Sequence, residues 1–264
     1  MRTLKRLLGR SLFAVRLDAI LMRREAVVVA FHRVRDDADL SDSLTIDSRT
    51  FESYCEFFKR FFNVVPLATL VETLHAGRAP HRALAITFDD GYLDNFEHAA
   101  PILWKYSLPA TFFVVTRWIG GTVVPWWDRA EGACHPWMSW DQVRTLHRCG
   151  FDIGAHTRTH VDLGSVDGDE AEAEIRGSRV DLERNLRAPV DLFAYPYGGR
   201  GNLSEANRAL VKRAGFRCCC SCFGGEVTAE TDPLRLARVP INTSNSSPHG
   251  FGFEVAFGRT LLHA

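Results

Sequence analysis

The feature that most limits the fold is a regular alternation, about seven times along 264 residues, of short apolar runs with helical patterns. The apolar runs occupy residues 26–31, 83–88, 110–115, 151–155, 191–195, 216–222 and 234–241. Continuous apolar runs of this length are typical of strands that are buried on both faces of a parallel sheet. The sequence therefore predicts an α/β fold whose parallel sheet is either closed as a barrel or open and doubly wound.

The segments between these runs have the spacing of helices. Residues 49–62 place apolar side chains at helical intervals, and residues 204–215 begin with Ser204 as a cap and end on Gly215. Residues 167–186 are highly charged and carry only a narrow apolar stripe, which predicts an outer helix.

The composition favours one large domain with a neutral substrate. The chain is 46% hydrophobic, and its 32 basic and 32 acidic residues balance. A balanced charge gives no electrostatic reason to expect nucleic acid as a partner. Four of the seven cysteines fall within residues 218–222, a spacing unlike a disulfide framework or a zinc ribbon. We expect these cysteines to be reduced and to belong to a buried strand.

Three segments are expected: a basic N-terminal helix (1–25), a barrel (26–245) and a C-terminal tail (246–264). Arg10, Arg16 and Asp18 interrupt the apolar residues of the first segment, which argues against a secretory signal and against a spanning helix. We expect this helix to pack on its own domain. The alternative is peripheral contact with the face of an inner membrane. The expected location is therefore cytoplasmic or at that face.

Polar residues follow four of the predicted strands. His32 follows the first strand, Asp89 and Asp90 follow the second, and His156 follows the strand at 151–155, with His160 four residues later. The turn Pro196–Gly198 follows the strand at 191–195. Because the carboxyl ends of parallel strands meet at one rim, these side chains should lie close together.

Two histidines and one aspartate make a three-ligand set with an open position, as in catalytic zinc sites. If Asp90 binds the cation, its repulsion with Asp89 falls, and Asp89 is free to take a proton from bound water. The alternative is that the two aspartates belong to a turn that caps the next helix.

The motifs TFDDGY (87–92), HTRTH (156–160) and YPYGG (195–199), in this order, resemble the polysaccharide deacetylases, a carbohydrate esterase family that includes the nodulation chitooligosaccharide deacetylase. AFHRV (30–34) and RVPINTS (238–244) resemble a branch found in exopolysaccharide and lipopolysaccharide loci. Together these elements cover about residues 26–245.

The resemblance implies a single-domain, deformed (β/α)7 TIM-like barrel. It also implies a divalent ion held by Asp90, His156 and His160, most often zinc, with cobalt, nickel or manganese as alternatives. Asp89 would be the general base, and the backbone N–H of Tyr197 would help to hold the oxyanion. The implied reaction is removal of N-acetyl groups from an amino sugar by attack of a metal-bound water.

Two elements of the common family pattern are missing. The late Leu-x-His motif that supplies the general acid is absent, and Ala194 stands where an arginine usually opens the third motif. We favour His32 as the acid, with His249 as a weaker alternative. Arg238 would replace the missing arginine by orienting Asp89, unless it forms a structural ion pair with a helix carboxylate.

Tryptophans are candidates for contact with sugar rings, because indole faces stack on the apolar faces of sugars. The candidates are Trp126, Trp127, Trp137 and Trp140, and packing at helix edges is the alternative role. The expected substrate is an N-acetylated glycan or glycolipid. The alternative functions are hydrolysis of a small non-peptide amide and glycan binding without catalysis.

Overall fold

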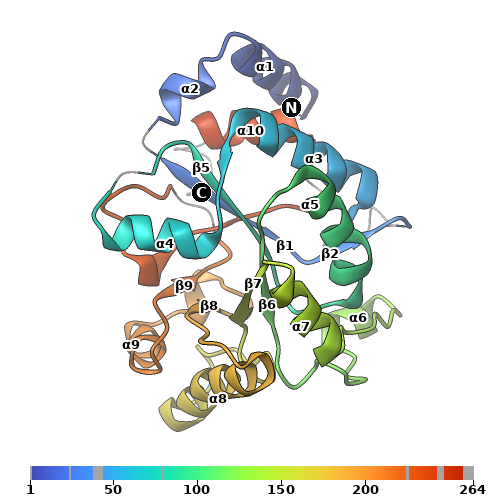
Figure 1. Cartoon of the computed structure of the whole chain (residues 1–264), viewed down its shortest axis with the longest axis vertical. Helices are drawn as coiled ribbons and strands as arrows, with labels where there is room; N and C mark the ends of the chain where they lie inside the picture. Colours follow the sequence, from blue (N-terminus) through green and yellow to red (C-terminus); the bar gives the residue numbers. More distant parts are fainter. Residues whose placement is uncertain are drawn as a thin grey trace.

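The computed structural model describes residues 2–23, 25–37, 44–78, 80–223, 226–242 and 247–257. Its centre is a sheet of parallel strands in the order β10-β1-β5-β6-β7-β8-β9, with β4 added beside β5 (Figure 1). These strands are β1 (Ala26–Phe31), β4 (Asn63–Val64), β5 (Ala83–Phe88), β6 (Thr111–Val114), β7 (Asp152–Ala155), β8 (Leu192–Ala194), β9 (Cys218–Cys220) and β10 (Val239–Pro240). The α/β fold predicted from the alternating pattern is confirmed.

The sheet curls into a deformed barrel that the segment 236–241 closes. Leu236 donates to the carbonyl of Cys219, and the Leu236 carbonyl accepts from Ser221. Five residues later, the Ile241 N–H donates to the carbonyl of Ala30 in β1 over 2.8 Å. The segment 236–241 therefore contacts β9 at one end and β1 at the other, which explains why only two residues of the predicted strand 234–241 are regular.

Helices cover the outside of the barrel. They are α1 (Arg2–Ala14), α2 (Asp18–Leu21), α3 (Ser48–Phe61), α4 (Leu67–His75), a π-helical turn (Asn95–Ala99) leading into α5 (Ala100–Tyr106), α6 (Trp126–Ala130), α7 (Trp140–Arg148), α8 (Gly168–Leu186), α9 (Glu205–Arg213) and α10 (Pro248–Phe257). As predicted, Ser204 caps α9 by accepting a hydrogen bond from the N–H of Asn207. No helix among the described residues combines the length and the apolar character needed to cross a membrane.

Aromatic side chains fill the layer between the sheet and α3. Phe31, Phe88 and Phe112 lie on neighbouring strands and stack, with ring centroids 5.4 and 4.9 Å apart. Phe31 also packs edge-on against Phe51 of α3, with ring centroids 5.1 Å apart. The cysteines of β9 are buried and free, so they fill space in the core as predicted.

Two differences from the predicted organisation involve the ends of the chain and the loop after β1. Part of the expected tail 246–264 forms α10, which packs along α1; residues 246 and 258–264 lie outside the described part. After β1, β2 (Arg33–Arg35) and β3 (Thr45–Asp47) form a small separate parallel sheet. Both strands lie outside the apolar runs from which strands were predicted.

Candidate active site

A cavity of about 320 Å³ opens at the carboxyl ends of the barrel strands. Its lining comes from the segments that follow β1, β5, β7, β8 and β9, together with α6 and β10. The lining residues are His32, Leu44, Asp89, Asp90, Trp126, Trp127, His156, His160, Tyr197, Cys222 and Pro240. The structure thus brings together the residues that the strand-end argument placed on one rim.

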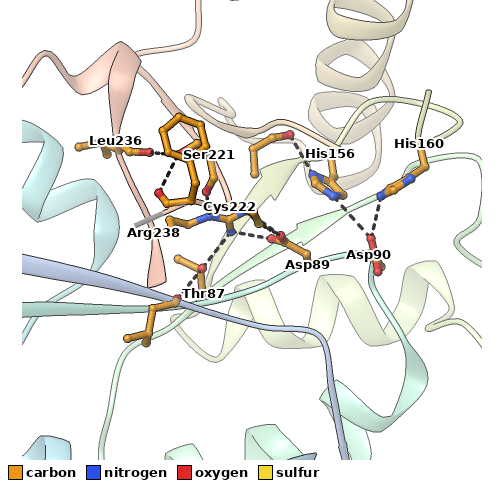
Figure 2. A network of polar contacts seen from close by, with 12 residues as sticks. Thr87, Asp89, Asp90, His156, His160, Ser221, Cys222, Leu236 and Arg238 are labelled. Atoms are coloured by element: carbon orange, nitrogen blue, oxygen red, sulfur yellow. Dashed lines mark hydrogen bonds and ion pairs between the residues drawn. The ribbon is translucent and has the colours of Figure 1, made fainter. Parts of the chain in front are cut away.

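Asp90, His156 and His160 converge in this cavity. The Nε2 atoms of His156 and His160 lie 3.5 and 3.3 Å from Oδ1 of Asp90, and all three side chains are buried. Figure 2 shows both imidazole rings pointing at this one carboxylate. One donor atom from each residue can be chosen so that all three lie within 4.8 Å of one another, as the ligands of a single ion would.

The chemistry of these three side chains fits a divalent cation. Oδ1 of Asp90 is buried and has no hydrogen-bond partner, although it faces two ring nitrogens. Nδ1 of His156 lies 2.8 Å from the carbonyl oxygen of Ala194, which fixes the ring and leaves Nε2 with its lone pair toward Asp90. Burial lowers the pKa of His156 to about 4, so its ring is neutral near pH 7. A neutral imidazole is the form that binds metal.

Four residues at the site have left-handed backbone conformations. Asp90 has φ 73°, while Thr157, His160 and Tyr197 each have φ 61°. Non-glycine residues pay roughly 1–3 kcal/mol for such conformations, which persist only where the surrounding structure fixes them. Here the Thr157 hydroxyl accepts a hydrogen bond from the N–H of His160, which holds the HTRTH turn closed. The turn thereby aims both histidines at Asp90.

Asp89 forms a two-pronged ion pair with Arg238. The two Nη atoms lie 2.7 and 2.6 Å from the two carboxylate oxygens, and both side chains are buried (Figure 2). Arg238 is itself held by the Ser221 carbonyl at 2.7 Å and the Thr87 hydroxyl at 3.0 Å. Its partner is thus Asp89 rather than a helix carboxylate.

This ion pair keeps Asp89 charged. Burial alone would raise the pKa of Asp89, but the positive charge of Arg238, the interaction with His156 and the hydrogen bonds from Arg238 outweigh it. The pKa of Asp89 therefore lies well below its ordinary value. Asp89 is therefore a carboxylate near pH 7, the form that can accept a proton.

Cys222 also contacts this pair, a position that the sequence analysis did not identify. Its sulfur lies 3.7 Å from Oδ2 of Asp89 and 3.1 Å from Nη2 of Arg238. Burial raises the pKa of Cys222 to about 12, so the group is a thiol. The signal was present, because Cys222 follows β9 in the same way that Asp89 follows β5.

His32 and Tyr197 lie on the wall of the cavity. His32 directly follows β1, and its carbonyl accepts a hydrogen bond from the Asn95 side chain over 2.7 Å. The Gly198 N–H bonds back to the Pro196 carbonyl over 2.6 Å, which makes the turn at Tyr197 tight. Within the described part of the chain, the Tyr197 N–H has no acceptor.

His249 lies elsewhere. Its ring is 5.1 Å from the ring of Phe57 and 6.4 Å from that of Phe13, on α3 and α1. It is not among the residues that line the cavity. The alternative assignment of the general acid to His249 is therefore wrong, because α10 is held against α1 and α3.

Two of the four candidate tryptophans line the cavity. Trp126 is 62% exposed, and Trp127 packs on His160, one of the candidate metal ligands, with ring centroids 5.0 Å apart. Trp137 is instead buried against Tyr92, with ring centroids 4.3 Å apart. Trp140 begins α7 and packs against the core. Only the α6 pair is in place to contact a substrate.

A buried ion pair fixes α6 over the cavity. Nη1 of Arg33, in β2, lies 2.8 Å from Oδ1 of Asp128 in α6, and both side chains are fully buried. The Tyr92 hydroxyl lies 3.3 Å from the same carboxylate and accepts a hydrogen bond from the Trp127 indole at 2.9 Å. The chain Arg33, Asp128, Tyr92 and Trp127 thus holds one wall of the cavity.

Two curated proteins are similar to this chain along most of its length. The chain is 24% identical over 242 residues to the poly-β-1,6-N-acetyl-D-glucosamine N-deacetylase of Staphylococcus epidermidis, covering 83% of this chain and 80% of that protein. The Staphylococcus aureus (strain MRSA252) protein of the same name is also 24% identical, over 82% of this chain and 79% of its own.

Solved structures show the same fold. The deacetylase PplD of Streptococcus pyogenes, in complex with acetate, superposes with a TM-score of 0.73 at 20% identity, over 87% of this chain and 97% of that one. IcaB from Ammonifex degensii gives 0.73 at 21% identity, over 88% and 97%. The family model described as polysaccharide deacetylase matches residues 76–219, more than half of the chain, and includes Asp89, Asp90, His156 and His160. The chain belongs to the polysaccharide deacetylase family.

Proposed function

We propose that this protein is a metal-dependent N-deacetylase that removes acetyl groups from an amino sugar in a polysaccharide or lipid-linked glycan. One observation carries the proposal. A carboxylate kept ionised by Arg238 lies beside a buried set of one carboxylate and two imidazoles in a single open cavity. A protein that only binds glycans has no use for a charged base next to a metal site.

Asp90, His156 and His160 would hold the ion. A divalent cation bound there supplies Lewis acidity, polarising an acyl oxygen and making a water molecule more acidic. Zinc suits one carboxylate and two imidazoles, and cobalt, nickel and manganese are the alternatives.

Asp89 would take the proton from the attacking water. Both of its oxygens accept hydrogen bonds from Arg238, so the carboxylate cannot rotate away from the cavity. A base of such low pKa is a weak one, and it suits a water molecule whose own pKa has been lowered. Arg238 therefore acts as a positioning residue, through Asp89.

The Tyr197 N–H and His32 would complete the reaction. Because the Tyr197 N–H lacks an acceptor in the described structure and belongs to a residue of the cavity wall, it is free to donate to the oxyanion of the tetrahedral intermediate. The amine must then leave with a proton. Among the histidines of the described residues, His32 is the one in the cavity that is not a proposed ligand, so we assign it as the general acid.

The relatives and the shape of the cavity support a glycan substrate. The Staphylococcus relatives are named for poly-β-1,6-N-acetyl-D-glucosamine. The exposed indole of Trp126 and the adjacent Trp127 offer apolar ring faces at the mouth of the cavity, as sugar-binding sites do.

Removal of the metal tests the proposal directly. We expect acetate release from N-acetylated β-1,6-linked glucosamine oligomers to fall to background after chelation and to return when Zn²⁺ or Co²⁺ is added. The metal content of His156→Ala should fall in parallel, because a three-ligand site that loses one ligand binds weakly. Acetate release that persists in metal-free protein would refute metal dependence. If the metal-loaded protein releases no acetate from any N-acetylated glycan, the proposed deacetylase activity is refuted.

His32→Gln should slow amide cleavage by a factor of about 10²–10⁴, the range for loss of a general acid. An activated aryl acetate should be cleaved almost as fast as before, because its leaving group departs without protonation. His249→Gln is the matched control, since its ring lies outside the cavity. Equal losses on amide and ester would show that His32 does not act as the acid.

A further inference from the structure

The N-terminal helices present an apolar face to solvent. Large hydrophobic side chains that are 40–72% exposed gather there: Leu4, Leu7, Leu8, Val15, Leu17 and Ile20. They make up six of the twelve exposed large hydrophobic residues of the described structure, within 17 residues of sequence. Single exposed apolar residues are common on protein surfaces, but a cluster of this kind marks a surface that contacts a membrane or another protein.

The packing of α1 on the rest of the protein does not use this exposed face. The opposite side of α1 already packs on α10, where Gly9 lies so close to His249 that a Cβ atom would come within 1.9 Å of its carbonyl oxygen. Lys5 of α1 also pairs with Glu254 of α10 at 2.7 Å. The helix is therefore fixed by one side, and the exposed leucines are on the other.

Positive charge flanks the apolar face. Residues 2–23 contain six basic residues and one acidic residue, although the whole chain is balanced. That single acid, Asp18, is buried and paired with Arg82. Arg6, Arg10 and Arg16 are exposed, and within the described structure none of them has an acidic partner. The positive charges of these three arginines are thus not neutralised by paired carboxylates.

A second cavity lies beside the same helix. It has a volume of about 290 Å³, and Arg6 and Arg10 of α1 and Arg60 of α3 line it, next to His249. Glu56 also lines it, but its carboxylate accepts a hydrogen bond from the Tyr106 hydroxyl at 2.7 Å. With three arginines and one glutamate in its lining, the cavity carries a net positive charge. Burial, followed by the charges of these arginines, lowers the pKa of His249.

We propose that α1, α2 and this arginine-lined cavity dock the protein on a bilayer that contains anionic phospholipids. The exposed leucines, Val15 and Ile20 would enter the interface between headgroups and acyl chains, and the arginines would contact lipid phosphates. The paired apolar and basic character favours a membrane over a second copy of this chain, because two such basic surfaces would repel each other. In Figure 1, α1 and α2 lie at the top, away from α6 at the lower right, whose Trp126 and Trp127 line the candidate active-site cavity.

Co-sedimentation with vesicles tests the proposal. The full chain should pellet with vesicles of phosphatidylcholine and phosphatidylglycerol, but not with phosphatidylcholine alone, and binding should fall as salt rises. Arg6→Ala combined with Arg10→Ala should lower the partition coefficient by roughly thirtyfold, since each basic residue near an anionic surface contributes about fivefold. Leu7→Ser should also weaken binding, because it removes apolar area from the interface.

Matched variants on the far side of the barrel serve as controls. Arg148→Glu in α7 and Val180→Ser in α8 change an exposed basic and an exposed apolar residue outside the surface, and should leave partitioning unchanged. Acetate release in solution should be the same for all variants, which shows that they are folded and separates this proposal from the proposed reaction. Equal binding to neutral vesicles, no binding at all, or a dimer that Leu7→Ser dissociates would each overturn the proposal.

Discussion

Asp89→Asn should lower kcat for acetate release by a factor of about 10²–10⁴, the range that a positioned general base contributes. Asparagine keeps the shape of the side chain but cannot accept a proton. The metal content should remain that of the native protein, because Asp90, His156 and His160 form the candidate metal site without Asp89. Acetate assays at saturating substrate, together with elemental analysis, measure the two effects.

Asp181→Asn is the matched control for this substitution. Asp181 is an ion-paired aspartate that is less buried than Asp89; it bonds to Arg158 at 3.2 Å and lies outside the cavity. We expect the kcat of Asp181→Asn to stay near that of the native protein. If Asp89→Asn retains native turnover with its metal site filled, Asp89 is not the base, and another group must activate the water.

Arg238→Met should lower both stability and activity. It leaves a buried carboxylate without its partner, a change that typically costs about 3–5 kcal/mol of unfolding free energy. The Ser221 carbonyl and the Thr87 hydroxyl also lose their donor. Turnover should fall because Asp89 is no longer held in one orientation. Urea unfolding gives the loss of stability, and acetate release gives the loss of activity.

Arg235→Met, in the same segment, is the control: it removes the same type of charge from an exposed ion pair instead of a buried one. Arg235 pairs with Glu205 on the surface, where both side chains are more than half exposed, so we expect the unfolding free energy to fall by at most about 1 kcal/mol.

The loss of stability in Arg238→Met should also depend on pH. Because the pKa of Asp89 is lowered in the folded state, its stabilising contribution is complete above the ordinary carboxyl pKa and is lost below it. The stability difference between native protein and Arg238→Met should therefore narrow below about pH 4. A stability difference that stays the same at every pH would show that the ion pair between Asp89 and Arg238 does not cause it.

The strands and the rim could be predicted because both follow from local rules. Runs such as Ala26–Phe31 and Ala83–Phe88 are buried on both faces, so they carry a continuous apolar signal that matches the observed strands at both ends. The rule that parallel strands end at one rim then brought His32, Asp89 and His156 together. These inferences need no knowledge of how distant segments pair.

Other features depend on long-range contacts that a single sequence does not encode. The partner of Arg238 lies 149 positions away, so the sequence left a structural ion pair with a helix carboxylate equally open. Asp128 looked like one acid among many, and only the fold brings it to Arg33 and Tyr92. The left-handed conformations of Asp90 and Tyr197 also went unrecognised, because neither is a glycine.

The tie between Arg33 and Asp128 couples the wall of the cavity to the candidate general acid. Arg33 stands next to His32 in the sequence, and Asp128 stands next to Trp127. The same wall rests on the candidate metal site, because Trp118 and Trp127 both pack against the ring of His160. An exchange of this segment that aims to change the substrate range should therefore keep Asp128 and these two indoles.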